Sequence, residues 1–125
     1  MLKFQSKSFS RSVLYALNGV RIAFKSQRNF RKHLLINIFI LLIGFFLKLP
    51  LLQMCFLLFL CMFVLVCEMF NSIIEFVIDA YYKNKWARLA KFAKDLGAGV
   101  VLIASCTSVF ISCVLFCAKL CENLP

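Results

Sequence analysis

The sequence predicts an all-α integral membrane protein with three transmembrane helices and an N-terminal amphipathic surface helix, forming one membrane domain over residues 1–125. The chain is 63% hydrophobic, whereas soluble domains contain roughly 45–50% apolar residues. In addition, residues 34–47, 49–67 and 96–118 contain no Asp, Glu, Lys or Arg. A bilayer core needs roughly 20 mostly apolar residues in a helix. With three such segments, 125 residues leave no room for a soluble catalytic domain.

The surface helix is predicted over residues 8–25. At about 100° per residue, apolar and basic side chains fall on two separate faces. The apolar face comprises Phe9, Val13, Leu17, Val20 and Phe24, and the polar face comprises Arg11, Asn18, Arg21 and Lys25. This pattern is typical of a helix that lies in the headgroup plane of a membrane.

The three spans are predicted over residues 33–49, 51–79 and 96–119. The first apolar segment is short for a span, but His33 and Lys48 at its two ends can reach the headgroup regions and extend it. Pro50 cannot continue the preceding helix, so it is expected to close a tight turn between the first two spans.

Basic residues are confined to blocks, which argues against a nucleic-acid partner and predicts the orientation. Of the 15 Lys and Arg residues, eight precede the first span and five lie between the second and third spans. Short loops rich in Lys and Arg stay in the cytoplasm. The N-terminus and the 80–96 loop are therefore predicted to be cytoplasmic, and the C-terminus is predicted to lie outside.

A polar stripe runs along the cytoplasmic end of the second predicted span. Glu68, Asn71, Ser72, Glu75 and Asp79 occur at offsets 0, 3, 4, 7 and 11, which places them within an arc of about 100° on one helix face. Three carboxyl groups on one stripe require cations, a metal or a protonated member. The alternative interpretation is a cytoplasmic helix extension with one solvated face.

A second chemical signal, Lys94 followed by small residues at 97–99, directly precedes the third apolar segment. An ammonium beside a helix start with accessible backbone N–H groups is suited to phosphate. There is no P-loop motif. Carboxylates that can hold Mg²⁺, together with a Lys at an anion site, describe phosphoryl transfer. At the inner interface, such a site is open to ATP from the cytosol and to a lipid hydroxyl from the bilayer.

These residues resemble the prokaryotic diacylglycerol kinase family, which includes the undecaprenol kinases. The similarity is carried by Glu68-Met-Phe-Asn71-Ser72-Ile-Ile-Glu75-x-x-x-Asp79 and by Ala93-Lys94-Asp95-x-Gly97-Ala98. It extends over about residues 9–118. The segment Arg28-Asn29-Phe30-Arg31-Lys32-His33 is most similar to the undecaprenol kinase branch.

The resemblance implies an ATP-dependent lipid kinase in the bacterial inner membrane, which uses Mg²⁺ and phosphorylates diacylglycerol to phosphatidic acid, or alternatively undecaprenol. It implies a homotrimer with active sites shared between subunits. It also implies roles for individual residues. These are Glu68 as general base, Glu75 as ligand of Mg²⁺ and nucleotide, and Asn71, Lys94, Asp95 and Tyr15 as nucleotide-binding residues.

Two positions depart from the family pattern. Where the family carries a second metal-binding glutamate, this chain has Gln27, whose amide oxygen brings no charge. The 83–88 loop also differs, and Trp86 in it is a candidate for stacking on adenine. Because of these departures, an alternative function remains: the protein could be a family member that has lost catalysis and serves as a structural membrane partner. A proton-coupled transporter is a further alternative, although transporter sites lie near the bilayer midplane.

Overall fold

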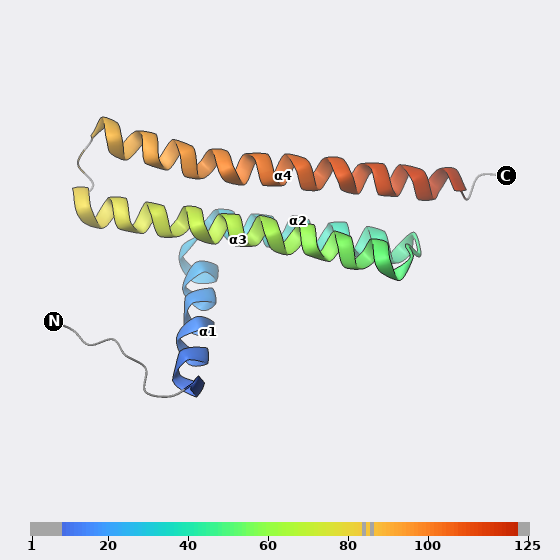
Figure 1. The fold of residues 1–125 in the computed structure, drawn as a ribbon, viewed down its shortest axis with the longest axis horizontal. Helices are drawn as coiled ribbons and strands as arrows, with labels where there is room; N and C mark the ends of the chain where they lie inside the picture. The colour runs from blue at the N-terminus through green and yellow to red at the C-terminus, as the bar shows by residue number, and fades with distance from the viewer. Residues whose placement is uncertain (1–8, 84, 86, 123–125) are drawn as a thin grey trace.

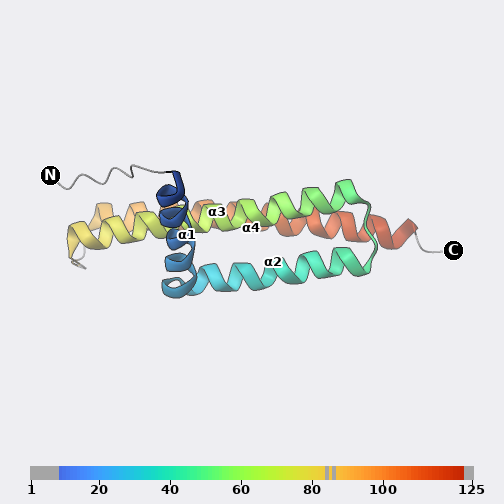
Figure 2. The ribbon, with the colours of Figure 1, turned by 90° about the horizontal axis from the view of Figure 1, so that it is seen from below.

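The computed structural model describes residues 9–83, 85 and 87–122, and within these ranges the chain is helical without strands. The helices are α1 (Phe9–Ser26), α2 (Arg28–Phe46), α3 (Leu51–Tyr82) and α4 (Arg88–Glu122). Helices α2, α3 and α4 run side by side along the long axis, and α1 runs across this direction and away from the bundle (Figures 1 and 2). Each of α2, α3 and α4 is long and apolar enough to cross a membrane, so the predicted fold class is confirmed.

The helices extend beyond the predicted spans at most ends. Helix α2 begins five residues before 33, α3 continues to Tyr82, and α4 begins at Arg88 rather than near 96. The apolar segments mark only the part of a helix that suits hydrocarbon, and the charged flanking residues continue the same helices. Helix α2 ends earlier than predicted, at Phe46, because Lys48 adopts a left-handed conformation with φ 53°.

The elbow between α1 and α2 depends on one extended residue and one side-chain cap. Gln27 has φ −102° and ψ 111°, which ends α1 and starts α2 in a new direction. Nη1 of Arg31 donates to the carbonyl oxygens of Phe24 and Lys25 at 2.9 and 3.0 Å, so it satisfies two carbonyls that the end of α1 leaves free. The elbow packs on α3 through an apolar cluster formed by Ala23, Phe30, Leu65, Leu34 and Met69.

The α2–α3 turn is a Schellman motif, in which two backbone bonds close the helix end. The N–H of Leu49 donates to the carbonyl of Gly44 at 3.1 Å, and the N–H of Lys48 donates to that of Phe45 at 3.0 Å. Gly44 is needed for close packing, since a Cβ there would lie 2.9 Å from Met54 Sδ. Pro50 lies in this turn, as the sequence predicts, and is the N-cap of α3.

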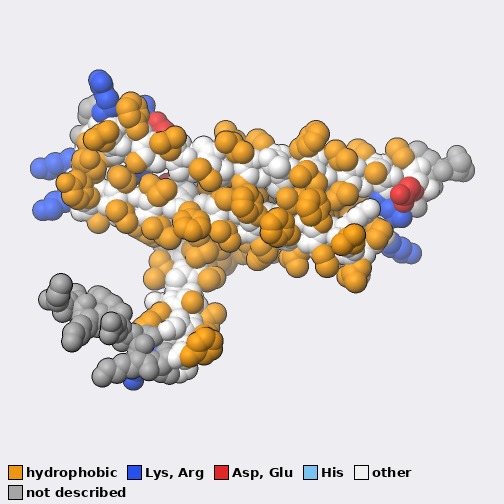
Figure 3. Space-filling view, viewed as in Figure 1, with side chains coloured by type: hydrophobic (Ala, Val, Ile, Leu, Met, Phe, Trp, Pro, Cys, Tyr) orange, Lys and Arg blue, Asp and Glu red, His pale blue; other side chains and the backbone are white. Residues whose placement is uncertain are grey.

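Helix α3 is the centre of the bundle, because both α2 and α4 pack against it. Its contact with α4 contains Val64, Cys67, Val101 and Ala104. Its contact with α2 includes a buried polar link, in which Nδ2 of Asn37 donates to the carbonyl of Cys61 at 2.8 Å. The face seen in Figure 3 is covered by hydrophobic side chains along the bundle, and Lys and Arg gather at the two ends. This distribution suits a multi-pass membrane protein.

Candidate active site

The polar stripe of α3 is largely buried inside the protomer. Glu68, Asn71 and Ser72 are 2%, 5% and 4% exposed, whereas Glu75 and Asp79, nearer the end of the helix, are half-buried. A solvated helix extension would leave the first three side chains in water. The burial therefore disfavours that alternative for the first part of the stripe.

Asn71 connects two members of the stripe and faces Gly97 of the neighbouring helix. Its Nδ2 donates to Oε1 of Glu75 at 3.3 Å, one helical turn further on. Its Oδ1 is buried and has no hydrogen-bond partner in the described part of the chain. Ser72, in contrast, donates to the carbonyl of Glu68 at 2.8 Å and so is bound within its own helix. Asn71 therefore holds Glu75 on one side and presents an unused acceptor on the other.

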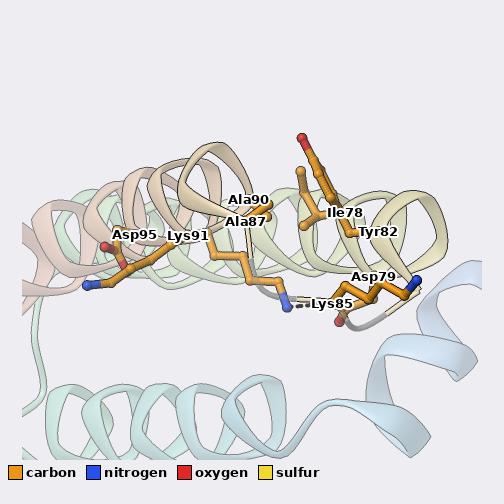
Figure 4. Close-up of a pocket in the computed structure, with 9 residues that line it drawn as sticks. Ile78, Asp79, Tyr82, Lys85, Ala87, Ala90, Lys91 and Asp95 are labelled. Atoms are coloured by element: carbon orange, nitrogen blue, oxygen red, sulfur yellow. Dashed lines mark hydrogen bonds and ion pairs between the residues drawn. The ribbon is translucent and has the colours of Figure 1, made fainter.

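A cleft of about 490 Å³ lies between α3, α4 and the loop that joins them (Figure 4). Two carboxylates and three lysines of the described residues line it. Nζ of Lys94 contacts Oδ1 of Asp79 at 2.5 Å, which joins the end of the stripe to α4. The cleft is lined by Ile78, Asp79, Tyr82, Lys85, Ala87, Ala90, Lys91, Lys94 and Asp95. Ammonium groups next to carboxylates can bind a phosphorylated ligand and its cation.

The prediction of a helix start near Gly97 is wrong. Because α4 begins at Arg88, residues 94–99 lie in its interior, where backbone N–H groups are already bonded to carbonyls one turn earlier. Lys94 and Asp95 instead reach the cleft from the side of the helix. Gly97 has a different role, since it is buried against Asn71.

Tyr15 and Gln27 do not join the stripe within one protomer. Tyr15 is 65% exposed on α1, and Gln27 is half-buried at the elbow. No hydrogen bond or ion pair connects either residue to the described stripe residues. The elbow does pack on Leu65 and Met69 of α3, which places it beside the level of Glu68. Trp86 lies outside the described residues.

Sequence reasoning missed two cationic residues of the cleft, Lys85 and Lys91. Lys91 precedes Lys94 by three residues, so helical spacing would have placed both on one face once α4 was known to begin at Arg88. Lys85 stands in the loop, where no periodic signal exists. The ion pair of Lys94 with Asp79 likewise depends on the register of α3 against α4.

The fold and the site define a three-span helical membrane protein with acidic, amide and basic groups at one end of its bundle. Residues 14–116 match the family described as prokaryotic diacylglycerol kinase, and the chain belongs to this family. The class predicted from the sequence, a diacylglycerol kinase-type lipid kinase, is thereby confirmed at the level of the family.

Curated relatives carry two names. A diacylglycerol kinase of Synechocystis sp. is 34% identical over 100 residues, which is 80% of this chain but only 57% of that protein. An undecaprenol kinase of Bacillus subtilis is 30% identical over 90% of both chains. A diacylglycerol kinase of Pseudomonas aeruginosa is 29% identical over 72% of both chains.

Proposed function

We propose that this protein is an ATP-dependent kinase that transfers the γ-phosphate of ATP to the hydroxyl of a membrane lipid at the cytoplasmic face of the bacterial inner membrane. Diacylglycerol, giving phosphatidic acid, is the first choice of acceptor, and undecaprenol is the second. The observation that carries the proposal is the polar stripe on α3, whose last residue, Asp79, pairs with Lys94 of α4 in the charged cleft.

We assign two different chemical roles to Glu68 and Lys94, according to where each residue lies. Glu68 is the deepest member of the stripe and forms no hydrogen bond or ion pair through its carboxylate with the described residues. An unpartnered carboxylate in a helix that can span the membrane is suited to accept the proton of a lipid hydroxyl. Lys94 is half-buried and can exchange Asp79 for phosphate oxygens, where its ammonium neutralises developing charge.

The residues around Asn71 fit Mg²⁺ bound with a nucleotide. Mg²⁺ is usually held by one or two carboxylates together with substrate phosphates and water. Glu75 offers the carboxylate, and Asn71 supports it, because Nδ2 of Asn71 donates a hydrogen bond to Oε1 of Glu75. When bound, the ion would neutralise the charge of the phosphate oxygens. Gln27 offers only a neutral amide, so we expect weaker metal binding than a second glutamate would give.

We further propose that the protein acts as a homotrimer with shared active sites. Within one protomer, Tyr15 and Gln27 have no hydrogen bond to the described stripe, and the charged cleft is open. A neighbouring copy could bring its surface helix to the cleft and close the site. The proposed orientation, with the N-terminus and the 80–96 loop in the cytoplasm, places the cleft where ATP is present.

A transfer assay tests the proposal directly. Purified protein in mixed micelles is given γ-labelled ATP, Mg²⁺ and diacylglycerol, undecaprenol or ceramide in separate reactions. Labelled phosphatidic acid is the expected product, and labelled undecaprenyl phosphate would favour the second acceptor. If no lipid becomes labelled, the kinase proposal fails, and the Gln27 substitution would then favour the alternative of a family member without catalysis.

A further inference from the structure

Gly97 of α4 lies against the side chain of Asn71 of α3. It is buried, and a Cβ built on its backbone would overlap Asn71 Oδ1. The same Cβ would also lie 3.5 Å from Cδ1 of Ile74, on the same face of α3. Gly99, two residues further along α4, would meet nothing within 4 Å. Of these two glycines, only Gly97 is packed so closely that a Cβ would overlap a neighbouring side chain, that of Asn71.

This contact limits how the amide of Asn71 can be oriented. Its Nδ2 is directed to Glu75 at 3.3 Å, and its Oδ1 faces the position where other residues carry a side chain. A Cβ fits there only if Oδ1 moves. A side chain at 97 would push Oδ1 away, so the amide, which belongs to a residue only 5% exposed, would have to move within the contact between α3 and α4. It would have to rotate and weaken its bond to Glu75.

We propose that Gly97 is a positioning residue that sets the orientation of the Asn71 amide and, through it, the carboxylate of Glu75. The inference rests on the proposed function, since Glu75 is there the ligand of Mg²⁺ and nucleotide and Asn71 is the amide that supports it. Gly97 itself touches no reactant. Its substitution should therefore change the requirement for Mg²⁺ and ATP and leave the affinity for the lipid acceptor unchanged.

The kinetic test compares Gly97→Ala with Gly99→Ala in the purified full-length protein. Loss of a hydrogen bond to a charged group corresponds to about a ten- to hundredfold change in an equilibrium constant, and a bond that is only weakened corresponds to the lower end. In Gly97→Ala we expect the Mg²⁺ concentration for half-maximal turnover to rise about tenfold and the KM for lipid to stay within twofold. In Gly99→Ala both should stay within twofold. Equal effects of the two substitutions, or a change confined to the lipid KM, would overturn the assignment.

A double-mutant cycle measured by thermal unfolding tests the contact without an activity assay. Gly97→Ala should lower the unfolding midpoint when Asn71 is present and change it much less in an Asn71→Ala background, where the overlap is removed. Failure of the single variant to fold, with recovery in the double variant, would also support the contact. A loss of the same size in both backgrounds would refute it. If the wild type labels no lipid in the transfer assay, the proposed function fails. The unfolding measurements still test the contact between Gly97 and Asn71, because they do not depend on activity.

Discussion

Replacing Glu68 by Gln should separate the catalytic from the structural consequence of burying a carboxylate. Glu68 is 2% exposed, lies inside a helix that is apolar enough to span a membrane, and forms no ion pair with the described residues. Glutamine keeps the size of the side chain and removes the ability to accept a proton. The same substitution should thus abolish transfer and stabilise the fold.

The expected changes in kcat and in the free energy of unfolding have different physical origins. A positioned general base contributes about 10²–10⁴-fold to a rate, so kcat should fall by at least about 100-fold. A charge at the centre of a membrane helix costs about 2.5–3.5 kcal/mol and less near its ends. The amide is still a buried polar group. We therefore expect Glu68→Gln to raise the free energy of unfolding by about 1–2 kcal/mol.

The measurements are lipid phosphorylation, unfolding in detergent and the oligomeric state by size-exclusion chromatography. Glu122→Gln is the matched control, because its side chain is 64% exposed and paired with Lys119 at the far end of α4. The control should keep full activity and change stability by less than about 0.5 kcal/mol. Near-wild-type turnover in Glu68→Gln would refute its role as base. A fall in stability would show instead that the carboxylate is stabilised by partners in the assembled protein.

Two further predictions concern the metal and the close helix contact. Gln27→Glu should lower the Mg²⁺ concentration needed for half-maximal activity, and an unchanged Mg²⁺ titration would show that position 27 is not a ligand. Gly44→Ala should lower the free energy of unfolding by about 1–3 kcal/mol, because the new methyl would meet Met54 and Leu57 at 2.9 and 3.1 Å. Gly19→Ala, with nothing within 4 Å, should instead raise it by up to about 1 kcal/mol, and equal effects in thermal melts would contradict this reasoning.

Hydropathy and charge predicted the number and order of the helices, because these depend on properties that the sequence shows directly. Pro50 marked the turn between α2 and α3, and the helix N-terminal to it ends as expected within a few residues. The start of α4 was predicted too late. Residues 88–95 include four charged residues, which interrupt the apolar signal, yet they contain no Gly or Pro that would break a helix.

For the candidate site, too, one part could be predicted from the sequence and another part could not. Periodicity placed Glu68, Asn71, Glu75 and Asp79 on one face, but it could not show which of them would be buried or what they would meet on α4. The bond of Lys94 to Asp79 depends on how far α3 and α4 are shifted along one another. The end of the surface helix agrees with the prediction within one residue, but the direct continuation into α2 after Gln27 was not predicted, because no Gly or Pro marks the elbow.

The Schellman turn between α2 and α3 has a consequence for biogenesis. Only residues 47–50 separate the two helices, and two backbone hydrogen bonds close the turn. Neither helix can move far across the bilayer without the other, so we expect the pair to insert as a preformed hairpin. Lys48 would be the only charge carried across with the turn. Helix α4 would then insert as a separate, later event onto a surface of α3 that is already in place.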